Sequence, residues 1–117
     1  MRVLLDTSFL ITAFGYKIDI MSELNRLIDS SIQLAIIDKT QQELKGKPLA
    51  SLIVKYLEMH HVFIIKTDQK KNVDNLILDN LTPETIVATQ DKGLKERLKK
   101  RKTTILTIRQ KRYITQI

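Results

Sequence analysis

Several residue types are scarce in this chain, and each scarcity excludes a kind of chemistry. The 117 residues contain no Cys and no Trp, and only three Gly and two Pro. Without Cys there is no disulfide, no thiolate-bound zinc or iron–sulfur cluster, and no thiol nucleophile. So few Gly and Pro leave little room for long disordered linkers, and we expect residues 1–117 to form a single folded domain.

Long apolar runs are also missing. No stretch reaches the roughly 18 apolar residues that a membrane helix needs. Asp6 interrupts the N-terminal segment MRVLLDTSFLITAF, and no small-residue cleavage site follows it, which argues against a signal peptide. We therefore expect no membrane partner and a cytoplasmic location.

Several common catalytic motifs are absent as well. The sequence contains no G-x-S-x-G, Walker A or G-x-G-x-x-G pattern, so serine hydrolysis, nucleotide hydrolysis and dinucleotide binding have no support. His60 and His61 are adjacent and lack the spacing of metal-binding histidines, which indicates a polar helix end.

Positive charge is concentrated at one end of the chain. Residues 1–91 hold 10 Lys or Arg and 12 Asp or Glu, whereas residues 92–117 hold 10 Lys or Arg and one acid, Glu96. A basic segment of this density suits a polyanion such as nucleic acid. A solvated, lysine-rich helix face is an equally simple interpretation of the segment by itself.

Apolar segments predict alternating strands and helices. Five short runs rich in Ile and Val predict strands at Arg2–Leu5, Leu34–Ile37, Val62–Ile65, Thr85–Ala88 and Thr104–Ile108. Helical spacing recurs in Ile20–Ile28, Thr40–Lys45, after Pro48, from Val73 and in Lys92–Lys100, with Asp38 as a possible N-cap. This order predicts a three-layer α/β/α sandwich with a central, mainly parallel five-stranded sheet.

Carboxylates recur where strands give way to helices. Asp6 and Asp91 directly follow predicted strands, Glu43 lies in the helix after the second strand, and Asp74 begins the helix after the third. Parallel sheets bind ligands at the carboxyl ends of their strands. Four carboxylates gathered there would repel one another, and a hard cation such as Mg²⁺ or Mn²⁺ relieves that repulsion.

Each acid also has a purely structural interpretation. Asp6 and Asp91 could cap the helices that follow them, and Asp74 could face a helix dipole. Glu43 could pair with Lys39 or Lys47 four residues away. These alternatives remain open on the sequence pattern alone.

The motifs around these acids resemble a known family. The segments LLDTSFL, QEL, VDNLIL and IVATQDKGLKERL follow one another as they do in PIN-domain nucleases. VATQDKGLKERLKK followed by TTILTIRQKRYI is the most specific part, and it is similar to small archaeal PIN proteins, VapC toxins and PIN domains that process ribosomal RNA. The resemblance covers nearly the whole chain.

The resemblance implies a site and a cofactor. By it, Asp6, Glu43, Asp74 and Asp91 bind Mg²⁺ or Mn²⁺, and the hydroxyl of Thr89 orients Asp91. Gln90 departs from the family, which usually has Asn there, and the chain has no fifth acid for a second metal.

The implied activity is that of an endoribonuclease that hydrolyses RNA phosphodiester bonds. Processing of ribosomal or other RNA, with a ribosome-assembly protein as partner, is one role, and a VapC-like toxin neutralised by an antitoxin is another. A non-catalytic RNA-binding scaffold is the alternative outside enzymes, and PIN relatives suggest a homodimer. Tyr113 either stacks on a base or packs against the body. The expected RNA contacts are Lys95, Lys99, Lys100, Arg101, Lys102, Arg109, Lys111 and Arg112.

Overall fold

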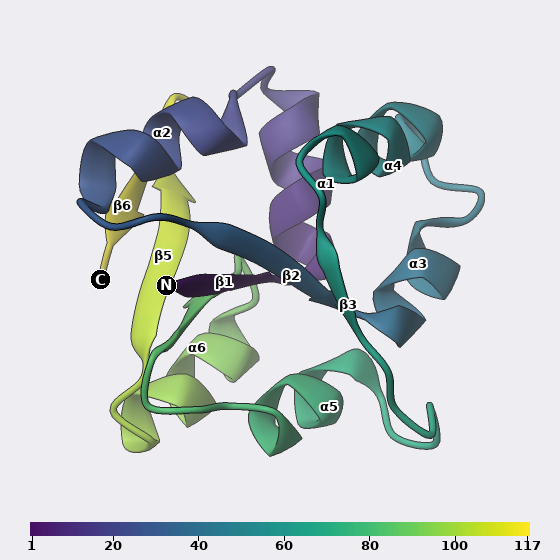
Figure 1. Cartoon of the computed structure of the whole chain (residues 1–117), viewed down its shortest axis with the longest axis vertical. Coiled ribbons are helices and arrows are strands. Elements are labelled where there is room, and N and C mark those ends of the chain that lie inside the picture. The colour runs from purple at the N-terminus through teal and green to yellow at the C-terminus, as the bar shows by residue number, and fades with distance from the viewer.

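The computed structural model describes all 117 residues, and strands alternate with helices along the chain (Figure 1). In chain order the elements are β1 (Arg2–Leu5), α1 (Thr7–Gly15), α2 (Ile20–Leu27), β2 (Gln33–Ile37), α3 (Asp38–Leu44), α4 (Ala50–Met59), β3 (Phe63–Ile65), α5 (Val73–Asp79), β4 (Thr85–Ala88), α6 (Lys92–Lys100), β5 (Thr104–Arg109) and β6 (Tyr113–Gln116). None of these helices is long and apolar enough to cross a membrane.

One sheet runs through the molecule in the order β3-β2-β1-β4-β5-β6. Strand β1 lies inside it, with Leu4 opposite Ala35 of β2 and Val87 of β4 in parallel register. Strands β3 and β5 extend the parallel part, and β6 alone runs antiparallel. Residues that follow β1 and β4 therefore emerge side by side at the same edge of the sheet.

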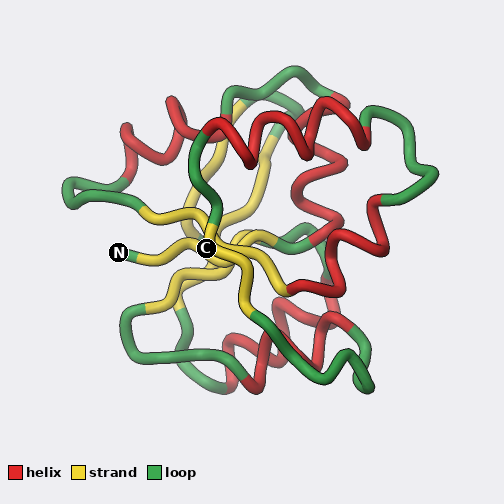
Figure 2. Tube along the Cα trace, turned by 45° about the vertical axis from the view of Figure 1, so that its right-hand side comes forward, coloured by secondary structure: helices red, strands yellow, loops and turns green.

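The two faces of the sheet support separate cores. Val3 and Leu5 belong to a cluster of 18 buried residues that includes side chains of α1, α2 and α4. Leu4 lies in a cluster of 12 with side chains of α5 and α6, because successive strand residues point to opposite faces. Figures 1 and 2 show the helices on both sides of the strands, which confirms the predicted α/β/α sandwich.

The sheet has six strands where the sequence predicted five. Residues Tyr113–Gln116 turn back along β5, with Tyr113 opposite Arg109. Gln110 and Lys111 form the turn at φ of 53° and 58°, a conformation that Asn and Gly favour. The segment RQKRY contains neither, so the sequence gives no signal for this hairpin.

Helix α1 and the start of α3 also differ from the prediction. The sequence suggested a helix after Asp6 but did not define the bounds of α1, because SFLITAF is almost entirely apolar and shows no helical alternation. Asp38 is not the N-cap of α3, which is Ile37. The Asp38 carboxylate instead accepts hydrogen bonds from the backbone N–H and hydroxyl of Thr67, at 2.8 and 2.7 Å, and so holds the chain after β3 against the end of β2.

Candidate active site

The four predicted acids line one pocket. Asp6 follows β1, Glu43 lies in the last turn of α3, Asp74 lies in the first turn of α5, and Asp91 precedes α6. They come together because the βα connections all open at the carboxyl edge of the parallel sheet. The pocket has a volume of about 430 Å³, and its other lining residues are Thr7, Ser8, Ile11 and Lys47.

Asp6 is the most enclosed of the four, with only 4% of its surface exposed. Its backbone N–H donates to Ala88 O at 2.9 Å, which joins the residue to β4. Its carboxylate Oδ2 accepts from Thr89 Oγ1 at 2.7 Å and from Ser8 Oγ at 2.8 Å. Burial raises the pKa of Asp6, these two hydrogen bonds oppose that rise, and the charge of Asp91 adds to it.

The two hydroxyls on Asp6 are themselves fixed by the backbone after β4. Thr89 Oγ1 accepts from the Asp91 N–H at 3.0 Å, and Ser8 Oγ accepts from the Gln90 N–H at 3.2 Å. Each hydroxyl therefore donates to one carboxylate and accepts from the adjacent loop. The resemblance implied that the Thr89 hydroxyl orients Asp91, whereas in the structure this hydroxyl donates to the Asp6 carboxylate and accepts from the backbone N–H of Asp91.

Asp6 does not act as a helix cap, although it occupies the N-cap position of α1. Its side chain makes no capping hydrogen bond there. Asp91, by contrast, does cap α6, because its Oδ1 accepts from the Leu94 N–H at 2.8 Å. Gly93 leaves room for this carboxylate, since an added Cβ would lie 3.3 Å from Asp91 Oδ1.

Asp74 is half-buried, and no donor in the structure reaches its carboxylate. Burial raises its pKa, and the charges of Asp6 and Asp91 raise it further. The positive charge of Arg97 opposes this rise, while Glu43 adds a smaller repulsion. Asp74 therefore experiences the negative charge of all three other acids without a hydrogen bond to offset it.

Glu43 does not form the helix-surface ion pair that was its structural alternative. The molecule contains two ion pairs, Arg26–Glu23 and Lys71–Asp79, and neither involves Glu43. Its Oε1 instead accepts from Thr7 Oγ1 at 2.5 Å, which connects the end of α3 to the start of α1.

Gln90 faces away from the acids and toward β5. Its Oε1 accepts from Thr107 Oγ1 at 2.8 Å and from the Ile108 N–H at 2.6 Å. Its Nε2 donates to Ile108 O at 3.3 Å. The extra methylene, relative to Asn, therefore lets residue 90 hold the loop before α6 against the neighbouring strand.

The predicted basic residues divide between two edges of the sheet. Lys95 lies near Arg109 and Lys99, and its pKa is lowered by burial and then by these two charges. Arg101 and Lys102 lie at the opposite edge, in a hollow that also contains Thr85 and Thr104, the first residues of β4 and β5. Arg101 donates to Leu78 O at 3.1 Å, a contact with the end of α5.

The remaining basic residues are exposed. Lys100 ends α6, and Lys111 and Arg112 lie in the β5–β6 turn. Lys111 Nζ lies 5.8 Å from the ring centre of Tyr16. Tyr113 is half-buried at the start of β6. This agrees better with the prediction that Tyr113 packs against the body than with a ring that is free to stack on a base.

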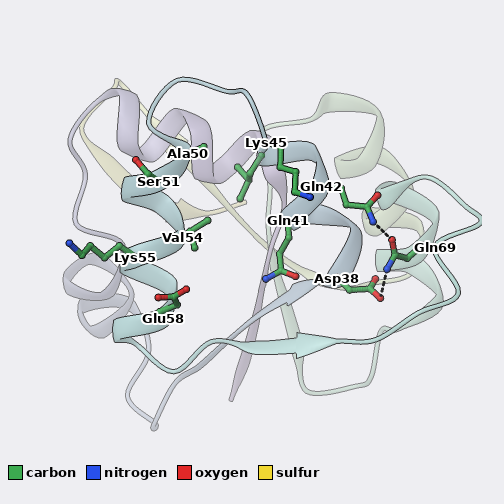
Figure 3. A pocket seen from close by; sticks show the side chains of 11 residues that line it. Asp38, Gln41, Gln42, Lys45, Ala50, Ser51, Val54, Lys55, Glu58 and Gln69 are labelled. Atoms are coloured by element: carbon green, nitrogen blue, oxygen red, sulfur yellow. Dashed lines mark hydrogen bonds between the residues drawn. The ribbon is translucent and has the colours of Figure 1, made fainter.

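A larger groove lies elsewhere, between α3 and α4, with a volume of about 860 Å³ (Figure 3). Asp38, Gln42 and Gln69 meet at one end of it, and Lys55 and Glu58 line the other (Figure 3). None of the four converging acids lines this groove. We therefore take the smaller acidic pocket as the candidate active site, because its charge is the more unusual feature.

The donor set of the acidic pocket fits a hard divalent cation. All four acidic side chains offer carboxylate oxygens, which Mg²⁺ and Mn²⁺ prefer. Asp74 has no donor, and both hydroxyls on Asp6 donate to Oδ2, so no side chain donates to Oδ1. In the present arrangement no three acids or histidines are grouped closely enough to hold an ion together. The side chains would have to close inward around a cation.

Three polar residues that line the pocket, and the apolar Ile11, were not identified from the sequence. Thr7 and Ser8 follow Asp6 in the DTS triplet, and hydroxyl residues directly after a strand-end acid are a signal that was available. Lys47 lies in the α3–α4 connection, where only a folded structure brings it to Asp6. No short motif marks it.

Comparisons of the sequence with known proteins point to one family. The family model described as PIN-like domain matches residues 3–111. Ribonuclease VapC4 of Methanocaldococcus jannaschii is 27% identical over 124 aligned positions, which cover 96% of this chain and 93% of that protein.

Solved structures share the fold. The PIN domain endonuclease Utp24 superposes with a TM-score of 0.84 at 23% identity, covering 98% of this chain and 90% of that chain. A domain of a protein of unknown function from Methanocaldococcus jannaschii superposes with a TM-score of 0.53 at 13% identity, covering 92% and 91%. Since the family model spans nearly the whole chain, this protein belongs to the PIN-like domain family.

Proposed function

We propose that the protein, acting as one PIN-like domain over residues 1–117, is an endoribonuclease that hydrolyses RNA phosphodiester bonds with Mg²⁺ or Mn²⁺. The observation that carries the proposal is the convergence of four carboxylates from four βα units in one pocket. The similarity to ribonuclease VapC4 over nearly the full length of both proteins supports RNA as the substrate.

The four acids would hold the cation. When bound, the cation supplies positive charge to the reacting phosphodiester and lowers the pKa of water. Asp6 is held by two hydroxyls and so presents a fixed ligand, with Oδ1 unused by side chains. Asp91 is held by the first turn of α6, whereas Asp74 and Glu43 close the site from the other side.

The RNA backbone would lie along those residues of the C-terminal basic segment that lie on the side of the pocket. Lys95, Lys99 and Arg109 gather beside α6, and the charge of Asp91 reaches Lys95. Contacts of this kind hold phosphates and do not read the bases. Arg101 and Lys102 belong to the opposite edge and would not contact the strand being cleaved.

Two biological roles fit the same chemistry. The similarity to VapC4 favours a toxin that an antitoxin protein neutralises. The basic C-terminal hairpin favours processing of ribosomal or other structured RNA together with assembly proteins. A gene for an antitoxin beside the gene for this protein would favour the first role. The family resemblance also suggests a homodimer, which analytical ultracentrifugation would test.

A panel of structured and single-stranded RNAs, incubated with Mg²⁺, Mn²⁺ or EDTA, tests the activity itself. We expect cleavage with metal, none in EDTA, and none with a folded Asp6→Asn variant. RNA binding without turnover under all conditions would contradict the enzyme and favour a non-catalytic scaffold.

A further inference from the structure

Lys47 is the only basic residue that lines the acidic pocket. It comes from the α3–α4 connection, residues 45–49, rather than from the C-terminal basic segment. Four carboxylates and one ammonium group therefore share a volume of about 430 Å³. The charge of Lys47 is opposite to that of the four acids, which suggests that Lys47 has a role different from theirs.

The backbone around Lys47 is held on both sides. Its N–H donates to Leu44 O at 3.0 Å, and its carbonyl accepts from the Ala50 N–H at 3.2 Å. Gly46 at φ 77° and Leu49 at φ 67° both adopt the left-handed conformation. The left-handed conformation of Leu49 costs conformational energy, because Leu49 is not a glycine. The ring of Pro48 also restricts its own φ, so the path of this connection is closely defined.

The charge of Lys47 is not used by an ion pair within the protein. Neither ion pair of the molecule includes it, and the nearest candidate in sequence, Glu43, accepts from Thr7 instead. An exposed ammonium group without a protein partner remains available to an anion from outside. The carboxylates of the pocket repel a phosphate group, and the positive charge of Lys47 opposes this repulsion at short distance.

Lys47 also lies on the side of Asp6 opposite Lys95 and Arg109. It follows β2 and α3, whereas Lys95 and Arg109 belong to α6 and β5. Strand β1, which Asp6 directly follows, lies between β2 and β4 in the sheet. Positive charge therefore flanks the acids on two sides, as a polyanion crossing the pocket would require.

We propose that Lys47 binds an RNA phosphate next to the cleaved bond on the β2 side, so that the strand crosses the acidic pocket from Lys47 toward Lys95 and Arg109. This inference rests on the proposed ribonuclease function and names the residue that positions its substrate. The competing role for Lys47 is that of a tethered counter-ion, which neutralises the acids until a metal displaces it.

Lys45 provides a matched control for the test. It has the same charge, lies two residues away, and lines the α3–α4 groove instead of the acidic pocket (Figure 3). The experiment compares Lys47→Gln, Lys47→Arg and Lys45→Gln with wild type. A short labelled RNA is titrated in EDTA, where no cleavage is expected, and melting curves establish that each variant folds.

We expect Lys47→Gln to weaken RNA binding about tenfold and to lower the salt slope of log K by roughly 0.7, the value for one phosphate contact. Lys47→Arg should bind within about threefold of wild type, because its charge is retained. Lys45→Gln should match wild type. In cleavage assays with Mn²⁺, Lys47→Gln should raise KM much more than it lowers kcat.

Unchanged RNA affinity for Lys47→Gln would overturn the inference. Tighter Mn²⁺ binding by that variant, with RNA affinity unchanged, would identify the counter-ion role instead. The binding measurements are made without turnover, so they test Lys47 even if the wild-type protein cleaves nothing. Absence of cleavage by wild type would contradict the proposed function alone.

Discussion

The candidate active site has two halves that differ in how firmly hydrogen bonds hold their side chains. In the hydrogen-bonded half (Asp6, Ser8, Thr89 and Asp91), every side chain has at least one partner at 2.7–3.0 Å. In the open half (Glu43, Lys47 and Asp74), Asp74 has no hydrogen-bond donor, Lys47 has no ion pair, and Glu43 accepts one hydrogen bond, from Thr7. The first half joins two adjacent strands, whereas the second comes from helices and a connection around them.

This difference indicates a division of labour within the site. Ligands that are fixed before binding lose little freedom when they bind. The hydrogen-bonded half is therefore suited to defining where a cation lies, because its geometry does not depend on the cation. In the open half the Asp74 carboxylate has no hydrogen-bond donor, so we expect this half to move more than the other when a cation and the substrate bind.

The largest effect is expected from Asp6, at the centre of the hydrogen-bonded half. Asp6→Asn keeps the shape and one oxygen acceptor but removes the charge, so RNA cleavage should fall to background while the protein stays folded. Cleavage rate and melting temperature are measured on the same samples. Near-normal cleavage by a folded Asp6→Asn protein would show that Asp6 holds no cation.

Thr89 should have the next largest effect, because its hydroxyl serves Asp6 and the Asp91 backbone together. Thr89→Val removes both hydrogen bonds and should lower the cleavage rate at saturating Mn²⁺ by about 10–100-fold. Thr89→Ser retains the hydroxyl and is the matched control. If Thr89→Val cleaved within about twofold of wild type, the hydrogen-bonded half would not need this residue.

The two halves also differ in how well the sequence predicted them. Asp6 and Asp91 follow short apolar strands, so their convergence follows from the parallel sheet alone. The direction of the Thr89 hydroxyl did not follow, since it depends on how β1 and β4 pair. The position of Lys47 depends on a connection in which two residues adopt the left-handed conformation. The spacing of residues along the sequence does not predict the course of such a connection.

The fold shows the same division between local and non-local information. Strands β1 to β5 were predicted because Ile and Val runs between polar residues identify buried strands. Strand β6 was not, because the turn at Gln110 and Lys111 lacks the residues that favour its conformation. The basic segment divides because α6 and β5 run in opposite directions, so Arg101 and Lys102 between them lie at one edge of the sheet and Arg109 lies at the other.

A smaller effect is expected from the basic residues, and it separates those two edges. Lys95→Gln/Arg109→Gln removes two charges near the pocket, and Lys100→Gln/Lys102→Gln removes two from α6 and its end at the far edge. The first pair should weaken binding to all RNA sequences and lower the salt slope by roughly 0.7 for each contact, whereas the second should change it little. Equal salt slopes for the two double variants would mean that the basic residues attract RNA without binding it along a defined path.

The smallest effect concerns the open half without metal. The pKa of Asp74 is raised by burial first and by neighbouring charges second. The folded state therefore favours its protonated form, and this contribution to stability is lost as pH rises from the ordinary value through the raised one. At neutral pH in EDTA, Asp74→Asn should stabilise the protein by less than about 1 kcal/mol. A lower melting temperature than wild type would contradict the absence of a partner for Asp74.

The most direct test of the central claim is the melting temperature of wild type and Asp74→Asn, each measured in EDTA and in excess Mn²⁺. A cation that binds only the folded protein stabilises it by about 2.7 kcal/mol at a hundredfold excess over Kd. We predict that Mn²⁺ raises the melting temperature of wild type by several degrees and that of Asp74→Asn by much less. Identical wild-type melting curves in Mn²⁺ and EDTA would contradict the account, because the four acids would then hold no cation.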